Sequence, residues 1–276
     1  MVPMVDLDAY FARIGYAGSP APTLATLHAL TAAHTQAIPF ENLDVLLGRG
    51  IALGADALFD KLVRRERGGY CFEQNGLFLQ VLEALGFRVQ PRGARVRIDR
   101  ARAETPPRTH MFLQVEIDGV RWLTDVGVGG LSLTAAIRLD AEGEQATPHE
   151  PRRIIREDER EEGRWFHQAL LGGVWTDVYE FTHEAMPPID REVANWFTSA
   201  HPGSHFKNRL IVARAAPDGR RLTLVNDELK IRGRDGRAEA RRVGSAEALL
   251  VLLQAEFGLR FPAETRFGPP GSPWPV

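Results

Sequence analysis

The sequence predicts an α+β protein, because helical and extended patterns occupy separate parts of the chain. Up to Gly86, apolar residues recur at the three- and four-residue spacing of helices that bury one face. From Phe87 onward, apolar and polar side chains alternate, as they do in strands with one buried face. A further helical segment follows near the C-terminus. Segregated helices and strands are typical of the α+β class.

The composition is that of a globular protein with a substantial core. The chain has 276 residues, of which 44% are hydrophobic and 25% charged. Its net charge of −2 gives no reason to expect nucleic acid or a membrane surface as a partner. The N-terminal residues lack the basic and apolar regions of a signal peptide, and no apolar stretch approaches about 18 residues. Together with a single cysteine, these features predict the reducing cytoplasm.

Four helices are expected before residue 87, and one near the C-terminus. The first ends at Gly15, and Pro39 keeps the segment after the second helix extended. Near the C-terminus, Ser245 caps a helix that Gly258 ends. The expected helices span residues 6–15, 23–35, 55–65, 71–85 and 245–257.

Strands are expected from Arg88 onward. The dipeptide Asp118-Gly119 is a strong signal for a type I′ turn, so it predicts a hairpin over residues 111–126. Dense charge between Asp140 and Arg164 predicts a solvated loop or edge hairpin, and the Pro/Gly-rich tail after Phe267 an irregular strap or a loose end. The other expected strands are residues 88–90, 94–98, 165–171, 174–181 and the pair 209–213 with 221–225.

The turn at residues 118–119 fixes which side chains share a face of the hairpin. Ile117 faces Val120 and Glu116 faces Arg121, and opposed residues point to the same side of a sheet. Glu116 and Arg121 are therefore expected to form a cross-strand ion pair. One face should be a core face, with Met111, Leu113, Val115, Ile117, Val120, Trp122 and Val126. The other should be polar, with His110, Phe112, Gln114, Glu116, Arg121, Leu123 and Asp125.

His110 and Asp125 become diagonal neighbours at the open end of that polar face. Diagonal Cα atoms lie about 7–8 Å apart, a span that an imidazole and a carboxylate can close. A carboxylate bonded to one ring nitrogen would fix the tautomer and turn the other nitrogen outward. The alternative is a surface pair without a chemical role.

Cys71 is the only cysteine, so no internal disulfide explains it. It opens the fourth expected helix, where the helix dipole and the unpaired N–H groups favour the nucleophilic thiolate. With His110 as general base and Asp125 as its orienting group, it would complete an activated-nucleophile triad. The alternative is a buried cysteine that acts as a small hydrophobic side chain. Spacing alone does not show that Cys71 reaches His110.

Several short segments stand in a fixed order between residue 6 and about residue 206. The most specific is Arg67-Gly68-Gly69-Tyr70-Cys71-Phe72-Glu73-Gln74-Asn75. In these segments the chain resembles the arylamine N-acetyltransferase family. The other matching segments are Asp6-Leu7-Asp8-Ala9-Tyr10, Ile38-Pro39-Phe40-Glu41-Asn42-Leu43, Thr109-His110, Asp125-Val126-Gly127-Val128-Gly129, Asn195-Trp196-Phe197 and His201-Pro202.

The resemblance implies a papain-like cysteine-enzyme core in three parts. A helical bundle (residues 1–86) would carry the nucleophile, a central β-barrel (87–195) would carry the histidine and the aspartate, and residues 196–276 would form an α/β lid. Cys71 would take an acetyl group from acetyl-CoA, His110 would act as its base, and Asp125 would orient His110. An arylamine or hydrazine would then accept the acetyl group in a ping-pong reaction.

The resemblance also implies contacts to the two substrates. Thr109, Gly127, Gly129, Ser204 and Phe206 would border CoA, which is a co-substrate rather than a permanently bound cofactor. Phe40, Phe72 and Val128 would face the acceptor, and the small Val128 would leave it more room. The alternatives are that Phe40 and Phe72 are plain core residues and that the glycines only form a turn.

The remaining charged residues near the motif suggest structural roles. Arg67 is expected to tie loops together, with Glu73 as its buried partner. The backbone N–H groups of Cys71 or Phe72 would form the oxyanion hole. No cluster of histidines and cysteines has metal-ligand spacing, so no metal is expected.

Two other functions fit the same triad. An amide synthase or a cysteine hydrolase would use the same Cys, His and Asp with another acceptor. A catalytically inactive binding or scaffold protein could also retain the fold, although the intact triad favours an enzyme. The physiological acceptor and the assembly state, including a homo-oligomer, are left open.

Overall fold

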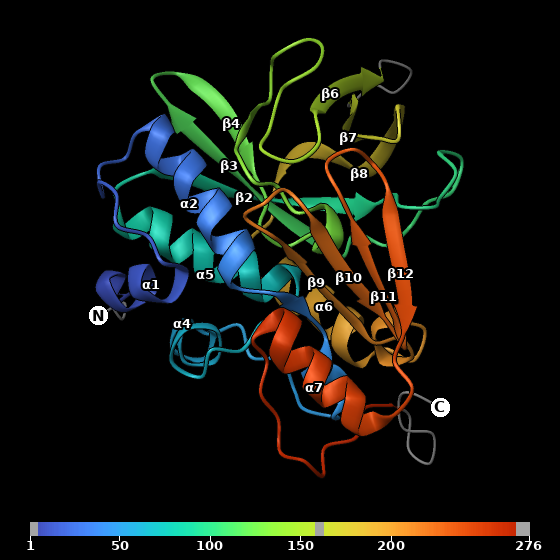
Figure 1. The fold of residues 1–276 in the computed structure, drawn as a ribbon. Helices are drawn as coiled ribbons and strands as arrows, with labels where there is room; N and C mark the ends of the chain where they lie inside the picture. The colour runs from blue at the N-terminus through green and yellow to red at the C-terminus, as the bar shows by residue number, and fades with distance from the viewer. Residues whose placement is uncertain (1–4, 158–162, 269–276) are drawn as a thin grey trace.

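The computed structural model describes residues 5–157 and 163–268, which form two antiparallel sheets surrounded by helices (Figure 1). The helices are α1 (Leu7–Ile14), α2 (Leu24–Ala37), α3 (Leu43–Leu46), α4 (Ala55–Phe59), α5 (Cys71–Ala84), α6 (Pro188–Ala200) and α7 (Ala246–Phe257), with shorter turns η1 (Asp60–Arg64), η2 (Gly129–Leu131) and η3 (His205–Lys207). The strands are β1 (Phe40–Glu41), β2 (Arg88–Val96), β3 (His110–Ile117), β4 (Val120–Thr124), β5 (Ile137–Arg138), β6 (Arg152–Glu157), β7 (Arg164–Leu171), β8 (Val174–Ala185), β9 (Ile211–Ala215), β10 (Arg221–Val225), β11 (Glu228–Arg232) and β12 (Ala238–Arg242).

The helices expected from the sequence are confirmed, with their ends close to the expected residues. Thr23 accepts a hydrogen bond from the Thr26 N–H at the start of α2, and Ser245 caps α7 in the same way. Gly15 and Gly258 end α1 and α7 in the left-handed conformation that glycine tolerates. The third helix continues from α4 into a π-helical turn, η1.

A seven-stranded sheet in the order β5-β4-β3-β2-β8-β7-β6 forms the barrel-like centre of the molecule. The predicted hairpin register is confirmed, since Ile117 pairs with Val120 and Glu116 is opposite Arg121. The predicted pairing of β9 with β10 is also confirmed. The two segments expected over residues 88–98 are one strand, β2, which passes through a register shift between Arg92 and Ala94.

The prediction of a polar hairpin face was wrong. Phe112 and Leu123 are fully buried on that face, in a core that also contains Tyr179 and Phe181 of β8. The sheet curves until both of its faces are covered, so alternation along one hairpin could not show that the second face is also buried. The expected Glu116–Arg121 ion pair is likewise absent from the described ion pairs, and Glu116 pairs with Arg88 of β2.

Helices α1, α2, α4 and α5 share one core with the opposite face of the hairpin. Their core contains Leu77 and Phe78 of α5 together with Met111 and Leu113 of β3. Within this core, α5 contacts both β2 and β3. The first residue of α5, Cys71, therefore lies near the start of β3.

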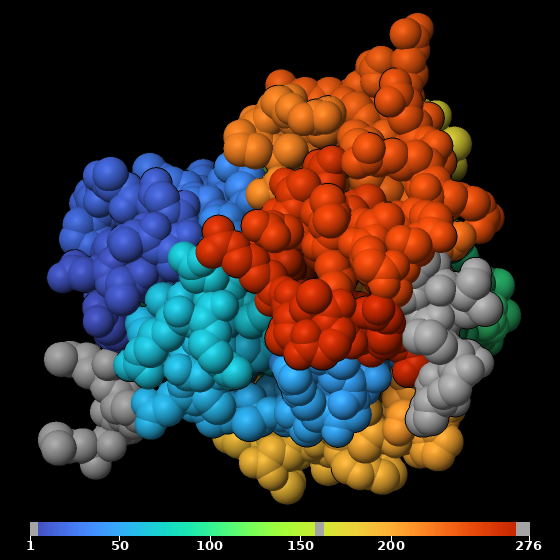
Figure 2. All heavy atoms as spheres, turned by 60° about the horizontal axis from the view of Figure 1, so that its bottom comes forward, coloured from blue at the N-terminus to red at the C-terminus, as the bar shows by residue number. Residues whose placement is uncertain are grey.

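A second sheet, β1-β9-β10-β11-β12, connects the two ends of the chain. Phe40 and Glu41 of β1 pair with β9, and Leu43 of α3 packs with Leu249 and Phe257 of α7. Figure 2 shows the red C-terminal residues beside the blue residues that follow α2. The division of the chain at residues 86 and 195 stays a prediction, and the two strands β1 and β9 pair across it.

Helix α6 and strands β11 and β12 had no counterpart among the expected elements. The large apolar residues Ile189, Val193 and Trp196 of α6 recur at helical spacing, which was the signal for this helix in the sequence, although all three side chains are exposed. The expected strap after Phe267 lies mostly outside the described residues. Among the described residues, no helix is both long and apolar enough to cross a bilayer.

The charged segment at residues 140–164 contributes β6, which lies at one edge of the seven-stranded sheet. Of the two structures expected for this segment, a solvated loop or an edge hairpin, this position agrees with the second. It also contains a buried junction between the two sheets. The Glu150 carboxylate accepts hydrogen bonds from Arg152 of β6, from Arg221 of β10 at 2.7 and 2.9 Å, and from Arg232 of β11 at 3.3 Å. Burial by itself would raise the pKa of Glu150, but the neighbouring guanidiniums lower it to about 2.

We expect Glu150→Gln to lower the free energy of unfolding at pH 7 by roughly 2–3 kcal/mol, because it leaves buried guanidiniums without their counter-charge. The pKa of Glu150 is lower in the folded state than in the unfolded state. The stabilisation that its carboxylate provides is therefore complete above about pH 4.5 and is lost as the pH falls toward 2. Urea unfolding of both proteins between pH 3 and 7 measures this. Glu247→Gln, at an exposed carboxylate paired with Arg266, is the matched control and should leave stability unchanged. A constant difference across this pH range would contradict the assignment.

Candidate active site

Cys71 is the first residue of α5 and is almost completely buried. Glu73 accepts a hydrogen bond from the Tyr70 N–H at 3.0 Å, which fixes the start of the helix. The Cys71 Sγ lies 3.5 Å from the Thr109 carbonyl oxygen. The thiol therefore lies at the positive end of α5, beside the residue that precedes β3.

His110 and Asp125 lie side by side, as the hairpin register predicted. The His110 Nε2 is 2.7 Å from the Asp125 Oδ2, and both side chains are buried. Because Asp125 holds Nε2, Nδ1 is the ring nitrogen left for the Cys71 side chain, which lies close enough to His110 to raise its pKa. The structure thus brings Cys71, His110 and Asp125 together, which spacing alone could not establish.

Asn75 holds the aspartate to the helix that carries the cysteine. Its Nδ2 donates to the Asp125 Oδ1 at 2.9 Å and to the Met111 carbonyl at 2.7 Å. Its Oδ1 accepts the Val126 N–H at 3.1 Å. Asn75 stands four residues after Cys71, so one helical face presents both, and this spacing was the signal in the sequence that could have revealed its role.

Tyr179 of β8 is a second residue of the site that the sequence did not reveal. Its ring lies 5.0 Å from that of His110, and its buried hydroxyl has no hydrogen-bond partner among the described residues. His167 of β7 packs on the other side of Tyr179, 4.8 Å away. These contacts depend on the pairing of β2 with β8, which a sequence pattern does not specify.

The charges of the site reinforce one another. Burial alone would lower the pKa of His110, but the Asp125 carboxylate and the hydrogen bond with Cys71 raise it to about 10. His110 in turn holds the pKa of Asp125 below its ordinary value, and hydrogen bonds from Asn75 and the Gly127 N–H act in the same direction. An ionised carboxylate beside a histidine that retains its proton is therefore the resting arrangement.

Glu73 pairs with a different residue from the one expected. Its carboxylate is 2.6 Å from the Lys61 Nζ, whereas Arg67 binds Glu41 at 2.6 Å and Asp44 at 3.3 Å. The structural role expected for Arg67 agrees with these contacts, but its partnership with Glu73 was wrong. Lys61 lies within the π-helical turn, where the spacing of an ordinary helix does not give the direction of a side chain.

Four of the residues expected to meet the substrates lie close together. Gly129 faces the ring of Phe40, which lies 6.1 Å from the ring of Phe206. Phe206 is 5.8 Å from Tyr70, and Tyr70 is 5.9 Å from Phe72. Phe40, Phe206, Tyr70 and Phe72 therefore form a row of aromatic rings, and Cys71 lies between the last two in the chain.

The other expected contact residues have structural partners. Ser204 donates its hydroxyl to the Thr198 carbonyl at 2.6 Å and accepts the Phe206 N–H, so its side chain caps η3. Val128 is buried in the core enclosed by the barrel-like sheet. Thr109 offers its carbonyl to Cys71. Contacts of these residues with a substrate stay a prediction. The absence of a metal also stays a prediction, although residues 5–157 and 163–268 contain no group of three or more His, Cys, Asp or Glu placed to hold a metal ion.

We expect Gly127→Ala to destabilise the protein by about 1–3 kcal/mol, because the added methyl has no room. Its Cβ would lie 2.7 Å from the Asn75 Nδ2 and 2.8 Å from the Cys71 Cα. Urea unfolding measures the loss. Gly244→Ala is the matched control, since a Cβ there meets nothing within 4 Å. Equal stability of the two variants would show that the close approach at Gly127 does not constrain the fold.

The raised pKa of His110 predicts a pH dependence. In an NMR titration of labelled histidines, His110 should keep its proton through pH 8 and lose it near pH 10. Its contribution to stability is complete below about pH 6.5 and is lost as the pH rises through 10. Asp125→Asn should move the transition to lower pH, whereas Asp140→Asn, at an exposed pair with Arg138, should not. A His110 that titrates near 6.5 in the unsubstituted protein would refute this.

Comparisons with known proteins agree with this geometry. A family model described as N-acetyltransferase matches residues 23–266. The arylamine N-acetyltransferase of Mycolicibacterium smegmatis is 46% identical over 92% of each chain, and human arylamine N-acetyltransferase 1 is 31% identical over 78% of this chain and 79% of that protein. The structure of the Mycobacterium marinum arylamine N-acetyltransferase in complex with CoA is 42% identical, covers 92% of each chain and has a TM-score of 0.86. The chain belongs to the arylamine N-acetyltransferase family.

Proposed function

We propose that this protein transfers an acetyl group from acetyl-CoA to arylamines or hydrazines through a thioester on Cys71. The observation that carries the proposal is the position of Cys71: it lies at the start of α5, in contact with Thr109 and beside the buried His110–Asp125 pair. A nucleophile, a base and an orienting carboxylate are the parts that covalent acyl transfer needs. The family relationship supports the same reaction.

In the first half-reaction, the Cys71 sulfur attacks the carbonyl carbon of acetyl-CoA. The thiol proton resides on the His110 Nδ1, and Asp125 stabilises the resulting imidazolium. The negative charge on the acetyl oxygen meets N–H groups of the first turn of α5, those of Cys71 or Phe72, which have no acceptor within the helix. The bond from carbon to the CoA sulfur then breaks, and His110 returns its proton to the departing thiolate.

In the second half-reaction, an amine attacks the acetyl carbon of the Cys71 thioester. His110 takes a proton from the attacking nitrogen, and the bond to the Cys71 sulfur breaks as the amide forms. Free CoA leaves before the acceptor reacts, so ping-pong kinetics are expected. No permanently bound cofactor takes part in this scheme.

The surroundings of Cys71 support an aromatic acceptor. Phe40, Phe206 and Tyr70 form a row of neighbouring aromatic rings, of which Tyr70 directly precedes Cys71, and Val128 is smaller than an aromatic side chain. We place the CoA arm along Thr109, Gly127 and Gly129, with Ser204 and Phe206 at its border. The relative whose structure holds CoA supports this placement. A reducing cytoplasm would keep Cys71 free, and nothing in the scheme requires a second copy of the chain.

The direct test is mass spectrometry of the intact protein after treatment with acetyl-CoA. We expect one acetyl adduct on the unsubstituted protein, none on Cys71→Ala and at most a trace on Cys71→Ser, because a hydroxyl is a far weaker nucleophile than a thiolate. Adding an arylamine should discharge the adduct and yield the acetylated amine. An adduct that survives Cys71→Ala would refute the thioester, and CoA release without acetylated amine would favour a hydrolase.

A further inference from the structure

The connection from β2 to β3, residues 97–109, delivers Thr109 and His110 to the active site. Only Arg97 and Pro106 of this connection are buried, so apolar packing does little to hold it in place. Its end nevertheless determines where the Thr109 carbonyl and His110 stand relative to Cys71. Some other interaction must fix its path.

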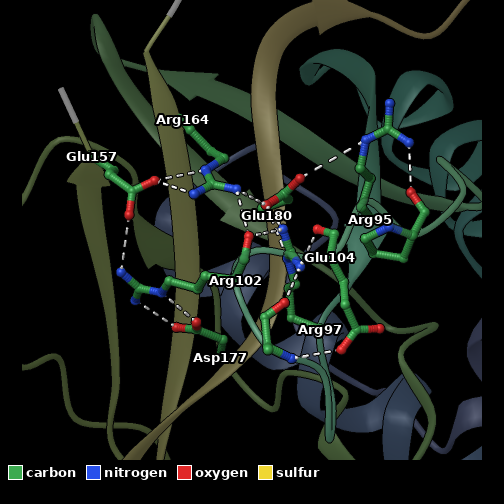
Figure 3. Close-up of polar contacts among 10 residues, drawn as sticks. Arg95, Arg97, Arg102, Glu104, Glu157, Arg164, Asp177 and Glu180 are labelled. Atoms are coloured by element: carbon green, nitrogen blue, oxygen red, sulfur yellow. Dashed lines mark hydrogen bonds and ion pairs between the residues drawn. The ribbon is translucent and has the colours of Figure 1, made fainter. Parts of the chain in front are cut away.

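The guanidinium of Arg97 supplies that interaction (Figure 3). An arginine has five N–H donors, and the hydrogen bonds of Arg97 use all of them. Its Nε and Nη2 donate to Glu180 of β8 at 2.9 and 2.5 Å. The remaining donors bind three backbone carbonyls of the connection: Nη1 those of Ala101 and Glu104, both at 2.8 Å, and Nη2 that of Arg102 at 3.2 Å.

Glu180 is the anchor of this arrangement. Its carboxylate is 8% exposed and also accepts a hydrogen bond from Arg164 of β7 at 3.0 Å. Arg95 lies 3.9 Å from the same carboxylate and donates to the Pro106 carbonyl at 2.6 Å, close to Thr109. Arg108, next to Thr109, pairs with Glu184 of β8 at 2.6 Å. Three arginines therefore tie successive parts of the connection to one strand.

We propose that Arg97 is a positioning residue for the reaction at Cys71. Anchored on Glu180, it holds the connection so that Thr109 and His110 meet the thiol in reactive geometry. Its side chain touches neither Cys71 nor a substrate, so it acts only through the backbone that it binds. A displacement of about 1 Å at a reacting group can reduce the rate up to a hundredfold. The test by acetyl-adduct formation rests on the proposed acetyl transfer, whereas the test by alkylation of Cys71 does not.

Arg97→Lys is the critical variant. Lysine keeps the positive charge, but its single ammonium cannot span Glu180 and three carbonyls. Arg102→Lys is the matched control: Arg102 belongs to the same connection and network, but its guanidinium binds the side chains of Asp177 and Glu157 rather than the backbone of the connection. Both substitutions remove a bidentate arginine contact, but only Arg97→Lys removes hydrogen bonds to the backbone of the connection.

Two rates are measured on each folded protein: alkylation of Cys71 by iodoacetamide at pH 7, and formation of the acetyl adduct from acetyl-CoA. We expect Arg97→Lys to lower both about tenfold, and Arg102→Lys to change neither by more than twofold. We also expect dilute ethylguanidinium to restore part of both rates in Arg97→Ala, whereas sodium chloride at the same concentration should not. Unchanged rates in Arg97→Lys, or equal losses in both lysine variants, would overturn the proposal.

A variant outside the buried centre keeps the proposal testable if Arg97→Lys does not fold. Arg95→Ala removes the hydrogen bond to the Pro106 carbonyl and should give a smaller loss in both rates; no loss would count against positioning by the connection. If the unsubstituted protein is alkylated but never acetylated, the proposed function fails. The alkylation rates then still decide the role of Arg97.

Discussion

The buried Asp125 carboxylate is the interaction on which the rest of the site depends. It lies fully inside the protein and accepts hydrogen bonds from His110 of β3, from Asn75 of α5 and from the Gly127 backbone. A charge in that position costs several kcal/mol unless its partners are in place. The folded state must therefore bring the hairpin, the cysteine helix and the following turn into one arrangement. The same requirement that stabilises the carboxylate also aligns the nucleophile and the base.

Much of this arrangement could be predicted from local rules. The Asp118-Gly119 turn fixes the hairpin register, and the register alone places His110 near Asp125. The start of α5 at Cys71 follows from the helical pattern after the glycines. Each of these conclusions depends on residues close together in the sequence. Period and turn chemistry are sufficient for such contacts.

The features that could not be predicted depend on residues far apart in the sequence. The second face of the hairpin is buried because the sheet curves, so that one core holds Leu123 of β4 and Ile154 of β6 from opposite ends of the sheet. The bonds of Arg97 to Glu180 arise from the same pairing of β2 with β8. Lys61 reaches Glu73 because a π-helical turn changes the direction of its side chain. In each case a residue that looks ordinary in sequence acquires its role from a distant neighbour.

The pairing of β1 with β9 has a consequence for how the chain is made. Phe40 and Glu41 emerge from the ribosome long before Val212 and Ala213, their partners in the finished sheet. During that interval the edge of β1 and the buried acid at Glu41 have no strand to cover them. Pairings between such distant segments form slowly and leave nascent chains open to misassociation. Helix α5, which bears the nucleophile, is thus synthesised early, whereas the five-stranded sheet cannot form until the last third of the chain has been made.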